Sequence, residues 1–175
     1  MIVVVILSFV AATIFVGLRA DQFESAYLSY TDDVLGSLIQ ARDVAIDDQT
    51  QVHVMIDEDG VEVFRVDPET NSVDFQWGHY VDNVDGGMLM DKACIAGMFA
   101  GIKPAIEGVD EDMPTDCLGG TEQLTFEPDG SFTLPNSPFP DAGMTLVVAD
   151  LESDNYSLIE VWPGGMVRKF DEVTP

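Results

Sequence analysis

The amino-acid sequence predicts an α+β protein in which a long N-terminal α-helix, hydrophobic in its first half, packs on an antiparallel β-sheet or β-sandwich head. Three observations predict this class. The chain opens with a run of residues that carries no charge, from Met1 to Leu18. An amphipathic helical pattern then continues to about residue 47, and the first proline is Pro68. The rest of the chain is typical of short strands separated by turn residues.

The uncharged segment, residues 1–18, has the length of a membrane span. At 1.5 Å per residue it reaches about 27 Å, close to the roughly 30 Å hydrocarbon thickness of a bilayer. A cleaved signal peptide is disfavoured, because the start is not basic and Gly17-Leu18-Arg19 is a poor cleavage site. A helix that is apolar on every side needs lipid or partner helices around it. The side chains expected to serve assembly are Ile2, Val3, Val4, Val5, Ile6, Leu7, Phe9, Val10, Ile14, Phe15, Val16 and Leu18.

Residues 19–48 are expected to continue the helix as an amphipathic segment that packs on the head. Most charged side chains lie off its apolar stripe, and Gly36 is the one weak helix former in its interior. We therefore expect a single helix over residues 1–48. The apolar residues that recur three or four positions apart are Phe23, Tyr27, Tyr30, Val34, Leu38, Ala41 and Ala45.

Residues 49–175 are expected to form one antiparallel, β-rich head with about eight short strands. The first two strands alternate around an Asp-Gly turn, as in a β-hairpin. Strands of this kind close into a sandwich or a curled sheet, one face of which the helix must cover. The expected strand segments are residues 51–56, 61–66, 73–77, 123–134 (two strands), 144–150, 156–162 and 166–173.

Residues 86–120 are expected to form an irregular, Gly- and Met-rich loop, with a short helix over Lys92–Gly101. The spacing of Cys94 and Cys117 in this loop matches no zinc motif. Outside the cytoplasm a disulfide between them is favoured, and closing the loop would contribute about 3 kcal/mol. Two unpaired buried thiols are the alternative.

The charge of the chain limits its partners. Seven Lys and Arg against 32 Asp and Glu give a formal net charge of −25, and the 46% of apolar residues argue against disorder. So acidic a surface repels phosphate backbones, and nucleic acid is not an expected partner. Cations suit it better, although no acidic cluster has the spacing of an EF-hand, and solvated loops are the alternative. The candidate Ca²⁺ ligands are Asp57, Asp59, Asp82, Asp85, Asp110 and Asp112.

The sequence contains no motif of a catalytic site, so we expect neither an enzyme nor a cofactor apart from the candidate Ca²⁺. Signatures of nucleotide-binding loops, zinc proteases and serine hydrolases are absent. His53 falls in an alternating strand and His79 lies between Trp77 and Tyr80. Neither has a nucleophile in a recognisable turn nearby, so both are expected to be packed or surface histidines.

Several segments resemble a known superfamily. The opening Met1–Leu7, with the small residues Ala11-Ala12-Thr13, resembles the N-terminal segment of type IV pilins and type II secretion pseudopilins. Within that superfamily, DDVLGSLIQARDVAIDDQTQVHVMI (residues 32–56) resembles the helix end and first strand of the GspH/FimT group. LTFEPDGSF (124–132) and IEVWPGGMVRKF (159–170) resemble the two late hairpins of the same group.

The resemblance implies a structural subunit of a type IV pilus or a type II secretion pseudopilus. Its implied partners are copies of itself or other pilin-like subunits in a helical filament. It would span the bacterial inner membrane once before assembly and then join an extracellular or periplasmic filament. The family's glutamate, which neutralises the N-terminal amine of the next subunit, either precedes Met1 or is replaced by Val5. The family's helix-breaking proline is absent from the end of the apolar run, where Gly17 is the nearest residue that could weaken the helix.

An alternative of a different class is a membrane-anchored periplasmic or surface β-domain that binds a ligand or Ca²⁺ and does not polymerise. A prepilin-peptidase site upstream of Met1 would favour the filament subunit. A basic cytoplasmic tail would favour the anchored domain. A role in DNA uptake is not expected, because Arg168-Lys169 is the one adjacent basic pair.

Overall fold

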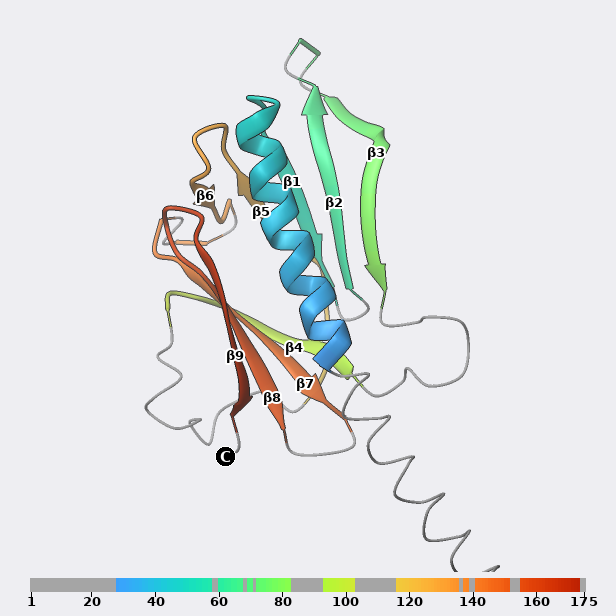
Figure 1. Ribbon diagram of the computed structural model, residues 1–175, viewed down its shortest axis with the longest axis vertical. Helices are drawn as coiled ribbons and strands as arrows, with labels where there is room; N and C mark the ends of the chain where they lie inside the picture. The colour runs from blue at the N-terminus through green and yellow to red at the C-terminus, as the bar shows by residue number, and fades with distance from the viewer. Residues whose placement is uncertain are drawn as a thin grey trace, which may run out of the picture.

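The computed structural model describes residues 28–57, 60–67, 69–70, 72–82, 93–102, 116–135, 137–138, 141–151 and 155–173, with residues 73–82 and 171–173 described by their backbone alone. Within these ranges the chain forms a helix over residues 28–47 and nine β-strands (Figure 1). The expected α+β class is confirmed. The part of the expected 1–48 helix that precedes residue 28 lies outside the described residues.

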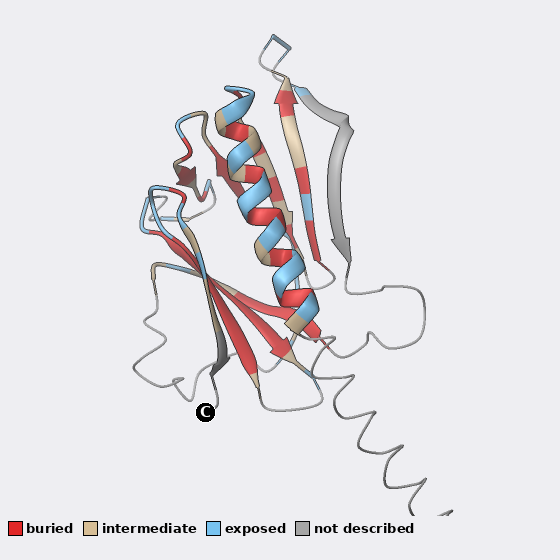
Figure 2. Ribbon diagram, viewed as in Figure 1, coloured by how far each residue is buried: buried red, intermediate tan, exposed pale blue. Residues whose placement is uncertain are grey.

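The helix buries one stripe of its surface, as the sequence pattern predicts. Tyr30, Val34, Leu38, Ala41 and Ala45 are buried, and exposed residues follow the opposite face (Figure 2). Burying a side chain such as Val34 or Leu38 contributes about 1.5–3 kcal/mol. This stripe is therefore what holds the helix on the strands.

The helix ends at a defined cap. Gln49 has a φ of 52°, the left-handed conformation that ends many helices. Its side-chain amide donates a hydrogen bond of 2.6 Å to the carbonyl of Ile46, and the Asp48 amide donates one of 2.9 Å to the carbonyl of Val44. These bonds satisfy carbonyls that the last turn would otherwise leave unpaired.

The first sheet contains five antiparallel strands in the order β3-β2-β1-β5-β6. The first hairpin pairs Val52 with Arg65 and Ile56 with Val61, which confirms the expected hairpin around the Asp-Gly turn. The third strand is longer than the expected 73–77. The strands of this sheet are β1 (Val52–Ile56), β2 (Gly60–Asp67), β3 (Ser72–Asp82), β5 (Glu122–Phe126) and β6 (Phe132–Thr133).

The second sheet contains four antiparallel strands in the order β4-β7-β8-β9. The late hairpin expected around Pro163-Gly164-Gly165 is confirmed, since Val161 pairs with Val167. The strands are β4 (Ala93–Ala100), β7 (Met144–Asp150), β8 (Tyr156–Val161) and β9 (Val167–Val173).

The short helix expected over Lys92–Gly101 is wrong, because Ala93–Ala100 forms strand β4 within the expected irregular loop 86–120. This strand pairs along β7, with a bulge between Ile95 and Gly97. Side chains on both faces of β4 are buried, Ile95 on one and Ala96 on the other, so the segment lacks the polar alternation of a surface strand. A short apolar run of this kind suits a helix or a buried strand equally well.

The main core lies where the helix meets the inner faces of both sheets. Figure 1 shows the helix running along the two sheets, and one cluster of buried residues joins all three elements. The first sheet contributes Phe126 and Phe132, whose ring centroids are 6.3 Å apart. The second sheet contributes Met144 and Ile159, both fully buried. The helix thus closes the core between the sheets.

Candidate functional site

The side chains expected to drive assembly, Ile2 to Leu18, lie outside the described residues. Along the ranges that the structure does describe, no helix has the length and apolarity needed to cross a bilayer. The membrane span expected at residues 1–18 therefore stays a prediction from the sequence. What the structure provides is the surface of the head and of the helix that follows this segment.

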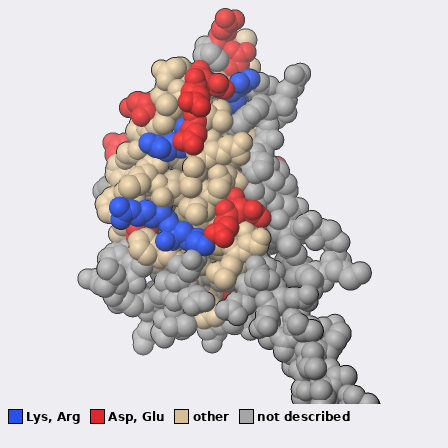
Figure 3. Space-filling view, in the orientation of Figure 1, with Lys and Arg blue, Asp and Glu red and all other residues tan. Residues whose placement is uncertain are grey.

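The outward face of the helix is acidic. It exposes Asp32, Asp33, Asp43 and Asp47, and Ile39 is the one large apolar side chain on this face between residues 28 and 47. On the face drawn in Figure 3, acidic side chains gather toward the end where the helix finishes. Repulsion between like charges therefore opposes the contact of two such faces.

Two ion pairs tie the helix to the sheets. Arg65 of β2 lies 2.8 Å from the carboxylate of Asp48, just beyond the helix end. Lys169 of β9 contacts the carboxylate of Asp32 near the start of the described helix. Each pair joins the helix to one sheet, so two of the basic side chains are engaged within the molecule.

Of the six candidate Ca²⁺ ligands, Asp57 and Asp82 lie among the described residues. The carboxylate of Asp57 accepts a hydrogen bond of 3.0 Å from the Gly60 amide and so stabilises the turn between β1 and β2. Of Asp82 the structure describes the backbone in β3. Across the described ranges, no three His, Cys, Asp or Glu side chains are placed to hold a metal ion. The remaining candidates, Asp59, Asp85, Asp110 and Asp112, lie outside those ranges.

His53 is a packed strand residue. Its Nδ1 lies 2.9 Å from both the Gln123 amide nitrogen and the Thr125 hydroxyl. Because the Gln123 nitrogen can only donate, Nδ1 accepts the hydrogen bond from Gln123. Burial lowers the pKa of His53, although the Glu127 carboxylate raises it. The side chain of His79 lies outside the described residues.

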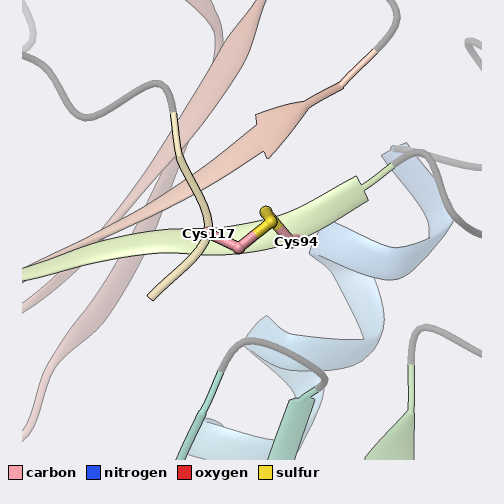
Figure 4. Close-up of a disulfide and its surroundings, with 2 residues drawn as sticks. All are labelled: Cys94 and Cys117. Atoms are coloured by element: carbon pink, nitrogen blue, oxygen red, sulfur yellow. A yellow bond between two sulfur atoms is a disulfide. The ribbon is translucent and has the colours of Figure 1, made fainter. Parts of the chain in front are cut away.

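Cys94 and Cys117 form a disulfide (Figure 4), with their Cα atoms 5.7 Å apart. Cys94 lies in β4 of the second sheet, and Cys117 precedes β5 of the first. The Leu118 amide also donates a hydrogen bond of 2.7 Å to the carbonyl of Ile95. The disulfide expected from the sequence thus connects strand β4 of the second sheet to the segment that leads into strand β5 of the first sheet.

Three segments that carry the family resemblance meet at one junction. Gly130 in the turn between β5 and β6 has a φ of +81°, and Gly165 in the turn between β8 and β9 has a φ of +75°. A Cβ built on Gly165 would lie 1.8 Å from the Gly130 carbonyl oxygen and 2.9 Å from Nε of Arg42. A Cβ on Gly130 would lie 2.8 Å from Cδ1 of Ile46. Both sheets and the helix are in contact here because both turns lack a side chain.

Beside this junction, the hairpin of β8 and β9 holds a buried carboxylate. Glu160 is 2% exposed and lies opposite Arg168. The Trp162 side chain donates a hydrogen bond to the Glu160 carboxylate. The Oε1 atom of Glu160 has no hydrogen-bond partner among the described residues. The Arg168 guanidinium lies 5.8 Å from the centroid of the Trp162 ring.

The electrostatics of Glu160 are set by opposing influences. Burial raises the pKa of Glu160, and the hydrogen bond from Trp162 and the charge of Arg168 act to lower it. Sequence reasoning missed this group of side chains. The signal was present, because in a hairpin closed by Pro-Gly-Gly the strand register places Glu160 across from Arg168.

A shallow pocket lies where the end of β4 meets β5. Its volume is about 160 Å³, below the roughly 300–1,000 Å³ of usual ligand sites. The lining residues are Met98, Ala100, Glu122, Gln123, Leu134 and Ser137.

Comparison with known proteins identifies the fold. No family model and no curated protein matches the sequence. Two crystal structures of the type IV minor pilin FimU of Pseudomonas aeruginosa superimpose with a TM-score of 0.50 each, at 11% and 12% identity. They cover 82% and 86% of this chain and 91% and 89% of the pilin chains. The minor pseudopilin EpsH of the Vibrio cholerae type 2 secretion system superimposes with a TM-score of 0.47 at 12% identity. The match covers 83% of this chain and 96% of the EpsH chain. The chain has a pilin-like fold.

Proposed function

We propose that the chain is a structural subunit of a pilus-like filament, either a type IV pilus or a type II secretion pseudopilus, and not an enzyme. The observation that carries the proposal is the pilin-like fold, in which one helix packs by a single stripe across two antiparallel sheets. The sequence that leads into this helix opens with an uncharged segment, residues 1–18. A filament gives that segment a place away from water.

The hydrophobic effect supplies the driving force for assembly. In the membrane the apolar side chains of residues 1–18 contact lipid, and leaving the membrane would expose them to water. Burying each large one among sister helices contributes about 1.5–3 kcal/mol. Because the contacts are head-to-tail, the array stays open and grows. The acidic heads face the solvent around the bundle.

The proposed partners are copies of this chain or other pilin-like subunits. Before assembly the subunit is held in the bacterial inner membrane by residues 1–18. After assembly it belongs to an extracellular or periplasmic filament. Nucleic acid is not among the proposed partners, because a net charge of −25 repels a phosphate backbone.

Photo-cross-linking of the full chain in intact bacteria tests this proposal. A p-benzoylphenylalanine probe replaces Phe15, inside the apolar segment, and surface filaments are sheared off and examined by immunoelectron microscopy. We expect adducts to this chain or to pilin-like subunits, in material that labels along filaments. The same probe at Leu151, an exposed residue that follows β7, serves as the matched control in the head.

The contrary outcome is a solitary subunit. If the Phe15 probe reacts with lipid alone and the full chain is extracted as a monomer that never enters filaments, the proposal is wrong. The anchored, non-polymerising β-domain would then be the remaining candidate.

A further inference from the structure

Two of the four large apolar side chains exposed on the described surface belong to a single turn. Trp162 follows β8 and is 36% exposed, and Met166 precedes β9 and is 43% exposed. The Trp162 amide donates a hydrogen bond of 2.9 Å to the Met166 carbonyl, so the two residues close the same turn. Trp and Met are enriched at protein interfaces.

Basic side chains flank the same turn. Of the four described Lys and Arg, Arg65 and Lys169 pair with carboxylates beside or on the helix. The Arg42 side chain packs against Gly165, and its Nη1 lies 3.9 Å from the carboxylate of Asp43. Arg168 lies over Trp162. We call Arg42, Trp162, Met166 and Arg168 the turn surface. In Figure 3, basic side chains border an area that carries no charged group.

The turn surface is ordered before any partner arrives. The Trp162 indole is held by its hydrogen bond to the buried Glu160 carboxylate and by Arg168 over its ring. The turn is held by the close approach of Gly165 to the Gly130 carbonyl. A surface ordered in advance loses little conformational entropy on binding. Trp and Arg are also the residue types that most often carry binding energy.

A second copy of this chain offers a complementary surface. We call Asp47, Asp67 and Glu69 the acidic end. The hydrogen bond of 2.9 Å from the Val66 amide to the Gln51 carbonyl brings the end of β2 close to the end of the helix. In Figure 1 the turn between β2 and β3, which contains Glu69, lies away from the turn between β8 and β9. Two unlike patches of this kind make a head-to-tail contact that repeats along a filament.

We propose that the turn surface is a subunit interface that docks on the acidic end of a second copy of this chain. This inference rests on the proposed function and names the head contact of the filament. Trp162 and Met166 lose their solvent exposure there, and Arg42 and Arg168 face carboxylates of the neighbouring subunit. On a chain of net charge −25, this contact sets cations against carboxylates where other head contacts would oppose like charges.

Photo-cross-linking in intact bacteria tests the interface with the full chain. A p-benzoylphenylalanine probe replaces Met166, and mass spectrometry identifies the peptide to which it couples. We expect adducts between two copies, on peptides that contain the acidic end. The matched control is the same probe at Leu151, which is 44% exposed but lies outside the turn surface. It is expected to give no such adduct.

Charge reversal tests the recognition itself. Arg168→Glu, alone and with Arg42→Glu, is expected to lower the yield of Met166 adducts about tenfold or more, because like charges in a contact cost at least 1.4 kcal/mol. Adding Asp47→Lys and Glu69→Lys to the same chain should restore the yield. Restoration also shows that the reversed chain still folds. Unchanged yield in Arg168→Glu would overturn the proposal.

The Phe15 probe separates the failure of this inference from that of the proposed function. Adducts at Phe15 without adducts at Met166 would overturn the interface and leave the filament subunit standing. Absence of both would overturn both. Met166 adducts exclusively to a different protein would overturn the assignment of a second copy as the partner.

Discussion

At the scale of single residues, Glu160 is a buried carboxylate whose hydrogen bonding is incomplete among the described residues. Burying a carboxylate costs free energy unless hydrogen bonds and opposite charges compensate for the lost water. Glu160 has Trp162 and Arg168 as partners, but its Oε1 has none among the described residues. Because the pKa of Glu160 is raised, protonation of this side chain favours the folded state over the unfolded state. The role of Glu160 in holding Trp162 therefore carries a cost in stability.

Replacing Glu160 with Gln removes the charge and keeps an acceptor for Trp162. Since the folded-state pKa lies above the ordinary value of 4.5, ionised Glu160 destabilises the fold at pH 7, and this cost disappears as the pH falls below 4.5. We expect Glu160→Gln to raise the free energy of unfolding by about 1 kcal/mol at pH 7. The gain should vanish near pH 4. Thermal unfolding of the full chain in detergent, followed by circular dichroism, measures both.

The matched control for Glu160 is Glu62→Gln. Glu62 is an exposed strand residue, so the same change there should shift the free energy of unfolding by less than about 0.5 kcal/mol. If Glu160→Gln instead destabilised the protein at pH 7, the attraction between the carboxylate and Arg168 would outweigh the cost of burial.

At the scale of elements, the two sheets are joined through their turns. The turns that contain Gly130 and Gly165 come from different sheets and meet against Arg42 and Ile46 of the helix. The 1.8 Å between a hypothetical Cβ on Gly165 and the Gly130 oxygen is far below any real contact, so the junction requires glycine. Helix and sheets are thus aligned by a contact at the backbone.

Gly165→Ala should therefore separate the two turns. The new Cβ clashes with a carbonyl oxygen, and the left-handed φ adds strain, so we expect a loss of about 3 kcal/mol or more in the free energy of unfolding. At this chain length that corresponds to a melting temperature lower by roughly 6–12 °C. Gly164→Ala is the matched control, because no atom lies within 4 Å of its hypothetical Cβ. Equal melting temperatures for the two variants would contradict the account of the junction.

The elements also show how far the sequence predicts the fold. Hairpins closed by Asp-Gly and Pro-Gly-Gly were predicted correctly, because turn residues act locally. Strand β4 was not, because its apolar run becomes a strand through pairing with β7, some fifty residues later. The turn surface could be predicted from the sequence in part. The pairing of Glu160 with Arg168 follows from the hairpin, but the approach of Arg42 to Gly165 depends on tertiary packing.

At the scale of the whole molecule, charge opposes the assembly that the helix favours. Chains with a net charge of −25 repel one another over long distances, whereas contacts at the turn surface act over a few ångströms. Taking head centres about 40 Å apart, raising the salt from about 0.01 M to about 0.15 M weakens the repulsion by a factor of roughly 40. Close, partly buried ion pairs are screened much less.

Filaments that contain this chain should therefore dissociate at low ionic strength and become more stable as salt is added. Sedimentation of sheared filaments at about 0.01 M and about 0.15 M NaCl measures the polymerised fraction, which we expect to rise with salt. Mg²⁺ and Ca²⁺ compared at equal ionic strength provide the control, because screening alone affects both equally, and a larger effect of Ca²⁺ would indicate specific sites among the acidic loops. A polymerised fraction independent of salt would mean that the charge of the heads faces no neighbouring head within the filament.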